Sequence, residues 1–126
     1  MTDHDKLTGV HPALVLYVHR ILDAMKALGF EMMVTDGLRT TAQQKALYAQ
    51  GRTVPGHIVT HADGDTHKSK HQTGHAVDCC FVVGGEPSWA ESNPWPLYGA
   101  MAAALGLLWG GDWDAPKTDR PHVELR

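Results

Sequence analysis

The chain has 126 residues, of which 43% are hydrophobic and 20% are charged, and its formal net charge is −3. These values are typical of one soluble globular domain spanning residues 1–126, and they exclude the basic excess expected of a nucleic-acid-binding protein. No apolar run approaches a membrane span and the first residues lack a signal pattern. We therefore expect synthesis in the cytoplasm and no stable association with membranes.

The first half of the chain predicts a helix, a strand, a second helix and a long loop. Apolar residues recur at three-and-four spacing over residues 10–28, which predicts an amphipathic helix that Gly29 ends. Residues 31–35 are typical of a short strand, and residues 40–50 begin with a capping-box pattern and predict a helix. The polar residues 51–70 predict a loop of a length that usually borders a functional site.

The second half predicts a central strand, an alanine-rich helix and two short strands. Residues 76–83 form a nearly continuous apolar run, as expected of a buried strand. A helix is expected over residues 94–107, and short strands over residues 107–109 and 122–125. This order predicts an α+β fold, in which about three helices pack around a small, largely antiparallel sheet that carries the functional site.

The two cysteines, Cys79 and Cys80, are adjacent within the apolar run. A disulfide between neighbours would be strained, so the sequence favours two reduced and buried thiols. With only two cysteines, a four-cysteine zinc site is excluded.

Four side chains near the central and last strands suggest hydrolytic metal chemistry. Asp78 is a carboxylate in an otherwise apolar strand, where an unpaired charge is costly, so a metal or a buried Arg or Lys must compensate it. Together with His71 and His122 it would leave one position of a tetrahedral zinc ion open for water. Asp119 then remains as a general base. The sequence predicts a zinc hydrolase, although each residue taken alone has an ordinary surface or ion-pair interpretation.

Residues 69–78 and 119–122 resemble the zinc D-alanyl-D-alanine carboxypeptidase and L-alanyl-D-glutamate endopeptidase family, which cuts bacterial peptidoglycan stem peptides. The similarity extends over roughly residues 31–126, including the Gly37-Leu38-Arg39-Thr40 and Trp109-to-Trp113 elements.

This resemblance implies one zinc ion per chain and assigns roles to the four side chains. His71, Asp78 and His122 would be the zinc ligands, and Asp119 the catalytic base. Arg39 would steady the substrate carbonyl and the oxyanion that forms from it.

Further roles are predicted for residues around these motifs. Ser69, Gln44 and Trp113 are candidate substrate-binding residues, although Ser69 could instead hydrogen-bond its local turn. Asp112 is a candidate for orienting a zinc-bound imidazole, and a simple turn carboxylate is the alternative. Two other metal sites in the long loop are alternative interpretations, a histidine site and a calcium-like turn, and a solvated turn is the simpler interpretation of the second. Their residues are His57, His61 and His67 for the first and Asp63 to Asp65 for the second.

The expected partner is the peptidoglycan stem peptide, cut between L-alanine and D-glutamate by a monomer. No cation near the motifs is free to act as a dedicated stop for a terminal carboxylate, which favours an endopeptidase over a D-alanyl-D-alanine carboxypeptidase. A non-catalytic, hedgehog-like zinc module is a third possibility, against which Asp119 and Arg39 argue. The absence of a signal pattern suggests an endolysin of phage type that reaches the wall in the periplasm after release.

Overall fold

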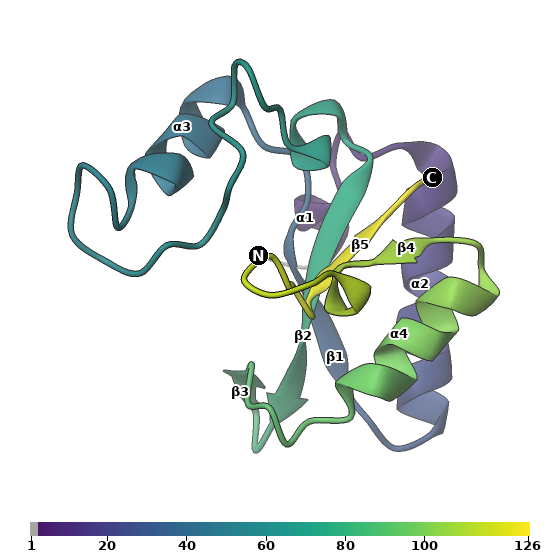
Figure 1. Cartoon of the computed structure of the whole chain (residues 1–126). Helices are drawn as coiled ribbons and strands as arrows, with labels where there is room; N and C mark the ends of the chain where they lie inside the picture. Colours follow the sequence, from purple (N-terminus) through teal and green to yellow (C-terminus); the bar gives the residue numbers. More distant parts are fainter. Residues whose placement is uncertain (1–2) are drawn as a thin grey trace.

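The structure of the protein is a computed structural model that describes residues 3–126 (Figure 1). Its elements in chain order are α1 (Asp3–Lys6), α2 (Pro12–Ala27), β1 (Met32–Asp36), α3 (Thr41–Ala49), the 3-10 helix η1 (Lys70–Thr73), β2 (Ala76–Val83), β3 (Glu86–Ser88), α4 (Trp95–Ala104), β4 (Leu108–Trp109), the 3-10 helix η2 (Gly110–Asp112) and β5 (His122–Glu124).

The strands form one small sheet in which every pair is antiparallel. Their order is β1-β2-β5-β4, and β3 pairs with the far end of β2. Strand β2 is therefore the centre of the sheet, as its apolar sequence predicts. Its register sets Asp78 opposite His122 of β5 and opposite Asp36 of β1. The predicted α+β fold with an antiparallel sheet is confirmed.

Helices α2 and α4 pack side by side against one face of the sheet, whereas α3 and the loop after it lie on the opposite side (Figure 1). The core beneath the two helices contains alternate residues of β2, namely Val77, Cys79 and Phe81. Because successive residues of a strand point to opposite faces, Asp78 is directed toward the face that α2 and α4 do not cover. Val123 of β5 is likewise in the core, so its neighbour His122 shares the face of Asp78.

The predicted helices form where their boundary signals lie. Thr40 caps α3 with the full reciprocal capping box that its sequence predicts. Helix α4 ends at Ala104, earlier than predicted, because Gly106 adopts a left-handed φ of 79° and turns the chain into β4.

Four short elements were not predicted: α1, η1, β3 and η2. Strand β3 follows Gly84 and Gly85, whose φ angles of 60° and 80° are those of a tight hairpin turn. The sequence did not predict this strand because it contains Pro87, and proline argues against a strand unless the strand lies at the edge of a sheet.

Cys79 and Cys80 are free and buried, as predicted. Within residues 3–126, no helix has both the length and the apolar composition that are needed to cross a membrane.

Candidate metal centre and active site

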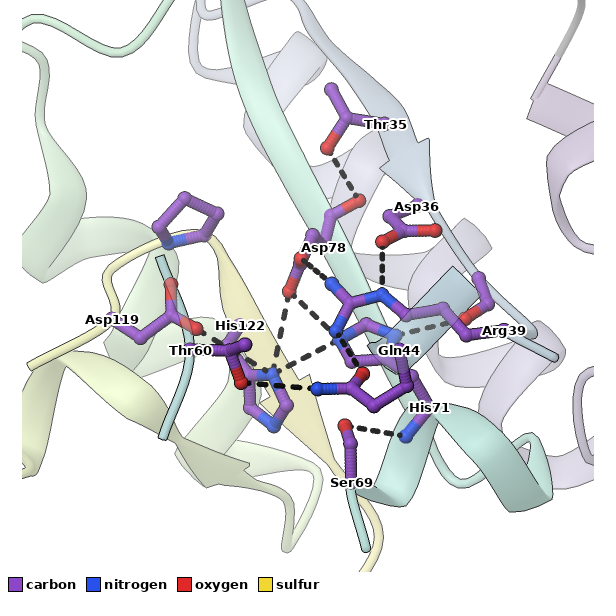
Figure 2. A network of polar contacts seen from close by, with 12 residues as sticks. Thr35, Asp36, Arg39, Gln44, Thr60, Ser69, His71, Asp78, Asp119 and His122 are labelled. Atoms are coloured by element: carbon purple, nitrogen blue, oxygen red, sulfur yellow. Dashed lines mark hydrogen bonds and ion pairs between the residues drawn. The ribbon is translucent and has the colours of Figure 1, made fainter. Parts of the chain in front are cut away.

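Three side chains from different elements converge on one point of the uncovered sheet face (Figure 2). Asp78 Oδ1 lies 3.2 Å from His71 Nε2 and 3.3 Å from His122 Nδ1, and the two nitrogens are 3.2 Å apart. His71 comes from η1, Asp78 from β2 and His122 from β5. The predicted set of ligand atoms is thus a nearly equilateral triangle, which we call the ligand triangle.

The backbone around η1 brings His71 to the strands. Ser69 caps this short helix, and its hydroxyl accepts a hydrogen bond from the His71 N–H at 3.2 Å. Gly74 ends the helix with a left-handed φ of 74°, and a Cβ there would lie 2.6 Å from the carbonyl oxygen of Gly9. Only glycine fits this position, which explains why the chain can turn so sharply between His71 and Asp78.

Each imidazole is oriented by an oxygen acceptor on its far side. His71 Nδ1 donates to the carbonyl oxygen of Gly37 at 2.8 Å, and His122 Nε2 donates to Glu124 Oε1 at 2.8 Å. With those outer nitrogens as donors, His71 Nε2 and His122 Nδ1 are the ring nitrogens left to bind a metal beside Asp78 Oδ1. This arrangement is the one that holds metal-binding histidines in place in other proteins.

The ligand triangle fits a zinc ion. Asp78 Oδ1 is buried and has no hydrogen-bond partner within the described part of the chain, and it lies beside two imidazole nitrogens that can each bind a metal once deprotonated. At zinc–ligand bonds of about 2.0 to 2.2 Å, ligand atoms of a tetrahedral ion lie about 3.3 to 3.6 Å apart. The separations in the triangle are close to these values, and two imidazoles with one carboxylate are donors that zinc prefers.

The charges around the triangle couple metal binding to protonation. Burial acts to lower the pKa of His122, but the carboxylates of Asp78 and Glu124 outweigh it and raise the pKa to about 9. A cation is therefore favoured at this point, whether it is a proton on His122 or a metal that displaces the proton.

Arg39 balances the negative charge of Asp78 from its second carboxylate oxygen, and three partners hold the Arg39 side chain in place. Its Nη2 lies 3.3 Å from Asp78 Oδ2, its Nε 2.6 Å from Asp36 Oδ2, and its Nη1 3.0 Å from Gln44 Oε1. The sequence left open whether a metal or an Arg balances Asp78. The structure shows Arg39 on one oxygen and the ligand triangle on the other.

Gln44 is fully buried rather than exposed to a substrate. Besides accepting from Arg39, its amide nitrogen donates to Thr60 Oγ1 at 3.1 Å and to the Ala62 carbonyl at 2.9 Å. The substrate-binding role predicted for Gln44 does not fit this position, because its amide is already used. Gln44 instead joins Arg39 to the long loop.

Asp119 lies beside the ligand triangle without being part of it (Figure 2). Its Oδ2 is 3.8 Å from His122 Nδ1, and 42% of its side chain is exposed. Its backbone N–H donates to the Gly110 carbonyl at 2.8 Å, which ties its loop to η2. Burial, reinforced by the charge of Asp78, raises the pKa of Asp119 to about 6. A carboxylate with such a pKa, next to but outside a metal centre, is suited to proton transfer.

The ligand triangle and Asp119 lie in a pocket of about 570 Å³. Residues 58–62 and 67–70 of the long loop line one side, as the length of that loop suggests. Trp113 lines the other side, with its ring centroid 4.9 Å from that of His122, and Ser69 also borders the pocket. Ser69 forms the local hydrogen bond that the sequence analysis gave as its alternative, and substrate contact by either residue stays a prediction.

Sequence reasoning missed Glu124, which the structure places against His122. Asp112, predicted to orient a metal-bound imidazole, is exposed, and the carboxylate that bonds to an imidazole is Glu124 instead. The His-x-Glu pattern of β5 could have predicted the contact between His122 and Glu124, because residues two apart in a strand share a face.

The alternative metal sites of the long loop do not form. Over residues 3–126, the ligand triangle is the one group of His, Cys, Asp and Glu side chains close enough to hold a metal ion. Asp63 is half-buried and forms a turn in which its carboxylate accepts from the backbone N–H groups of Asp65 and His67.

Comparison with known proteins identifies the family. Residues 62–125 match the family described as D-alanyl-D-alanine carboxypeptidase. The chain is 36% identical over 116 residues to the peptidoglycan L-alanyl-D-glutamate endopeptidase CwlK of Bacillus subtilis, covering 82% of this chain and 68% of CwlK. It is 29% identical over 108 residues to the L-alanyl-D-glutamate peptidase of Listeria phage A118, covering 84% of this chain but only 34% of the phage protein.

Among solved structures, the fold is similar to that of the L-Ala D-Glu endopeptidase ChiX of Serratia marcescens. The TM-score is 0.69 at 29% identity, and the match covers 98% of this chain and 86% of ChiX. The matched family residues include Asp78, Asp119 and His122, so the similarity extends over the site itself. The chain belongs to the D-alanyl-D-alanine carboxypeptidase family and is a peptidase.

Proposed function

We propose that this peptidase is a zinc-dependent endopeptidase that hydrolyses the bond between L-alanine and D-glutamate in the stem peptide of peptidoglycan. The observation that carries the proposal is the ligand triangle with Asp119 beside it in an open pocket. The names of CwlK, the Listeria phage peptidase and ChiX support the choice of bond.

One zinc ion per chain would be held by His71 Nε2, Asp78 Oδ1 and His122 Nδ1. When bound, zinc polarises a carbonyl and lowers the pKa of water to about 7. Gly37 and Glu124 fix the two imidazoles by accepting from their outer N–H groups. Arg39 supports Asp78 from its other oxygen, so the carboxylate cannot rotate away without breaking an ion pair.

Asp119 acts as the general base and then as the general acid. With 42% of its side chain exposed, its carboxylate can accept a proton from the attacking water and return it to the leaving amine. Such a positioned carboxylate typically contributes about 10² to 10⁴ in rate.

Arg39 is the cationic side chain that reaches the ligand triangle, through its ion pair with Asp78, and it would stabilise the carbonyl oxygen that becomes negative. Three of its five N–H groups are engaged by Asp36, Gln44 and Asp78, so two remain for the developing oxyanion. Such donors, fixed before the reaction, stabilise charge without reorganising.

The cations of the pocket favour an endopeptidase over a carboxypeptidase. Arg39 is engaged by its three partners, and Lys70 Nζ lies 3.4 Å from Glu124 Oε2 and 3.4 Å from the Leu125 carbonyl. Lys68 and Lys117 line the pocket with exposed side chains, and neither is built into a fixed stop for a terminal carboxylate.

We also propose a biological setting. A role on the bacterial wall in the periplasm, as a lysis enzyme of endolysin type, is supported by the relative from Listeria phage A118.

Digestion of purified peptidoglycan tests the proposed bond. The zinc-loaded protein is expected to create new glutamate amino termini and to release little free D-alanine, as measured by mass spectrometry of the fragments. If free D-alanine is the main product, the protein is a carboxypeptidase and the proposed bond is wrong.

A further inference from the structure

A second cavity of about 320 Å³ adjoins Asp119 on the side away from the long loop. It is lined by Trp89, Trp95, Thr118, Asp119, Arg120 and Pro121. Thr118 and Asp119 also line the main pocket, so the two cavities meet at the proposed base. Its volume is at the lower end of the range of small-ligand pockets, about 300 to 1,000 Å³.

The wall of this cavity is rigid and presents an exposed aromatic side chain. Trp89 follows β3 and is 54% exposed, so its indole is open to a ligand in the cavity. The segment around it is braced, because Asn93 Nδ2 donates to Ser88 Oγ at 3.1 Å and the indole N–H of Trp95 donates to the Ala90 carbonyl at 3.0 Å. Trp95 itself is 2% exposed and forms a fixed floor.

The two cavities differ in charge. Lys68 and Lys117 line only the main pocket. The second cavity contains one cation, Arg120, and its guanidinium lies 3.7 Å from the carboxylate of Glu91. Away from Asp119 the second cavity therefore offers an indole face, a hydroxyl and a guanidinium paired with Glu91, which suit an uncharged polar ligand.

The chemistry of the proposed substrate has the same asymmetry. On the leaving side of the scissile bond, D-glutamate carries a free carboxylate, which the lysines of the main pocket would attract. On the other side, L-alanine is joined by an amide to the lactyl group of N-acetylmuramic acid, an uncharged sugar in that linkage. A residue spans at most about 3.6 Å, so the sugar follows within about two residue lengths of the scissile bond.

We propose that the second cavity binds the N-acetylmuramic acid of the glycan strand, with the sugar ring against Trp89 and its polar groups at Thr118 and Arg120. This inference rests on the proposed function, since only cleavage next to L-alanine brings the sugar to Asp119. The stem peptide beyond the bond then lies in the main pocket.

Two matched substrates test the subsite with the zinc-loaded enzyme. One is the peptide L-Ala-D-Glu-L-Lys with an acetyl group on L-alanine, and the other is the same peptide on N-acetylmuramic acid. The wild-type kcat/KM is expected to be at least about tenfold higher on the muramyl substrate, corresponding to about 1.4 kcal/mol of added binding. Trp89→Ala is expected to remove this advantage and to change cleavage of the acetylated peptide less than twofold.

Leu16→Ala is the matched control, because Leu16 is similarly exposed, at 50%, but lies on α2. It should leave both substrates unchanged. If Trp89→Ala lowers both substrates equally, or neither, Trp89 does not recognise the sugar and the inference is overturned.

A binding measurement separates this inference from the proposed function. N-acetylmuramyl-L-alanine is titrated into the protein while the indole N–H resonances are followed, with Trp89→Phe used for assignment. The Trp89 resonance is expected to shift, and that of the hydrogen-bonded Trp95 to stay. An unmoved Trp89 resonance refutes the sugar site, whereas release of D-alanine without any L-alanyl cleavage refutes the proposed function.

Discussion

The two imidazoles of the ligand triangle are oriented by different kinds of acceptor. His71 donates to a backbone carbonyl, that of Gly37, whereas His122 donates to the carboxylate of Glu124. The carboxylate is 7% exposed and carries its charge beside the proposed metal, with Lys70 at 3.4 Å as its own counter-ion. A charged acceptor both fixes the ring and makes its free nitrogen a stronger donor to a metal.

Glu124→Ala is therefore expected to raise the zinc Kd by about 10- to 100-fold. Competition with a chromophoric chelator measures this constant without reference to activity. Glu124→Gln keeps an acceptor oxygen and should lose less affinity, and Glu86→Ala, at an exposed position of β3, should lose none. Unchanged zinc affinity in Glu124→Ala would show that the hydrogen bond does not support the ligand.

Asp119→Asn separates a base from a ligand at nearly constant shape. Because Asp119 lies outside the ligand triangle, the variant should retain zinc while turnover falls by about 10² to 10⁴. Elemental analysis and peptide hydrolysis measured on the same sample give both quantities, with His71→Ala as the variant expected to lose the metal. Joint loss of zinc and activity in Asp119→Asn would make Asp119 a ligand instead.

The sequence was sufficient to predict the site residues whose burial is energetically costly without a partner. Asp78 stood out as a charge in an apolar strand, and the structure places it against His71 and His122. Gln44 and Glu124 could not be assigned in the same way, because a buried amide and a strand carboxylate look like surface residues until their partners are known. Arg39 and Thr60 are partners of Gln44, and His122 is the partner of Glu124.

At the scale of elements, the site depends on α3 and the long loop being held to the sheet. Gln44 makes this connection from the interior of α3, because its one amide contacts Arg39, Thr60 and Ala62. The helix itself was predictable from its capping box. The path of the loop was not, since it is set by side-chain contacts between distant residues rather than by any periodic pattern.

Gln44→Met keeps the volume of the side chain and removes its hydrogen bonds. The Ala62 carbonyl and one Arg39 N–H group lose their partner, so the free energy of unfolding should fall by about 1 to 3 kcal/mol. Turnover should also fall, by about tenfold or more, because Arg39 is no longer fixed. Urea unfolding and steady-state kinetics measure the two effects.

Lys45→Met is the control on the same helix, where the side chain is 52% exposed. It should change neither quantity appreciably, because exposed ion pairs contribute little. If Gln44→Met behaves like this control, the buried amide does not hold the loop.

At the scale of the molecule, the sheet separates a structural face from a chemical one. Residues of β2 that point toward α2 and α4 build the core, and Asp78 on the other face enters the ligand triangle. This division could be predicted from the sequence, because Asp78 is the charged residue of an otherwise apolar strand and its neighbours point to the opposite face. The unpredicted hairpin to β3 matters at this scale too, because it brings Trp89 to the side of Asp119.

The two cysteines test how closed the core is. Burial raises the pKa of both thiols, so neither is expected to ionise or react near neutral pH in the folded protein. Ellman's reagent should titrate both thiols in guanidinium chloride and neither in native buffer, with glutathione as the reference for a free thiol. Rapid reaction in native buffer would mean that the core opens far more often than such burial allows.

The position of zinc tests the account most directly. A crystal of the zinc-loaded protein, measured on both sides of the zinc absorption edge, is expected to show one anomalous peak per chain, bonded to His71 Nε2, Asp78 Oδ1 and His122 Nδ1. No peak is expected among His57, His61 and His67, and Asp119 should remain unbonded. A zinc ion outside the ligand triangle, or one with Asp119 as a fourth protein ligand, would contradict the proposed centre and its mechanism.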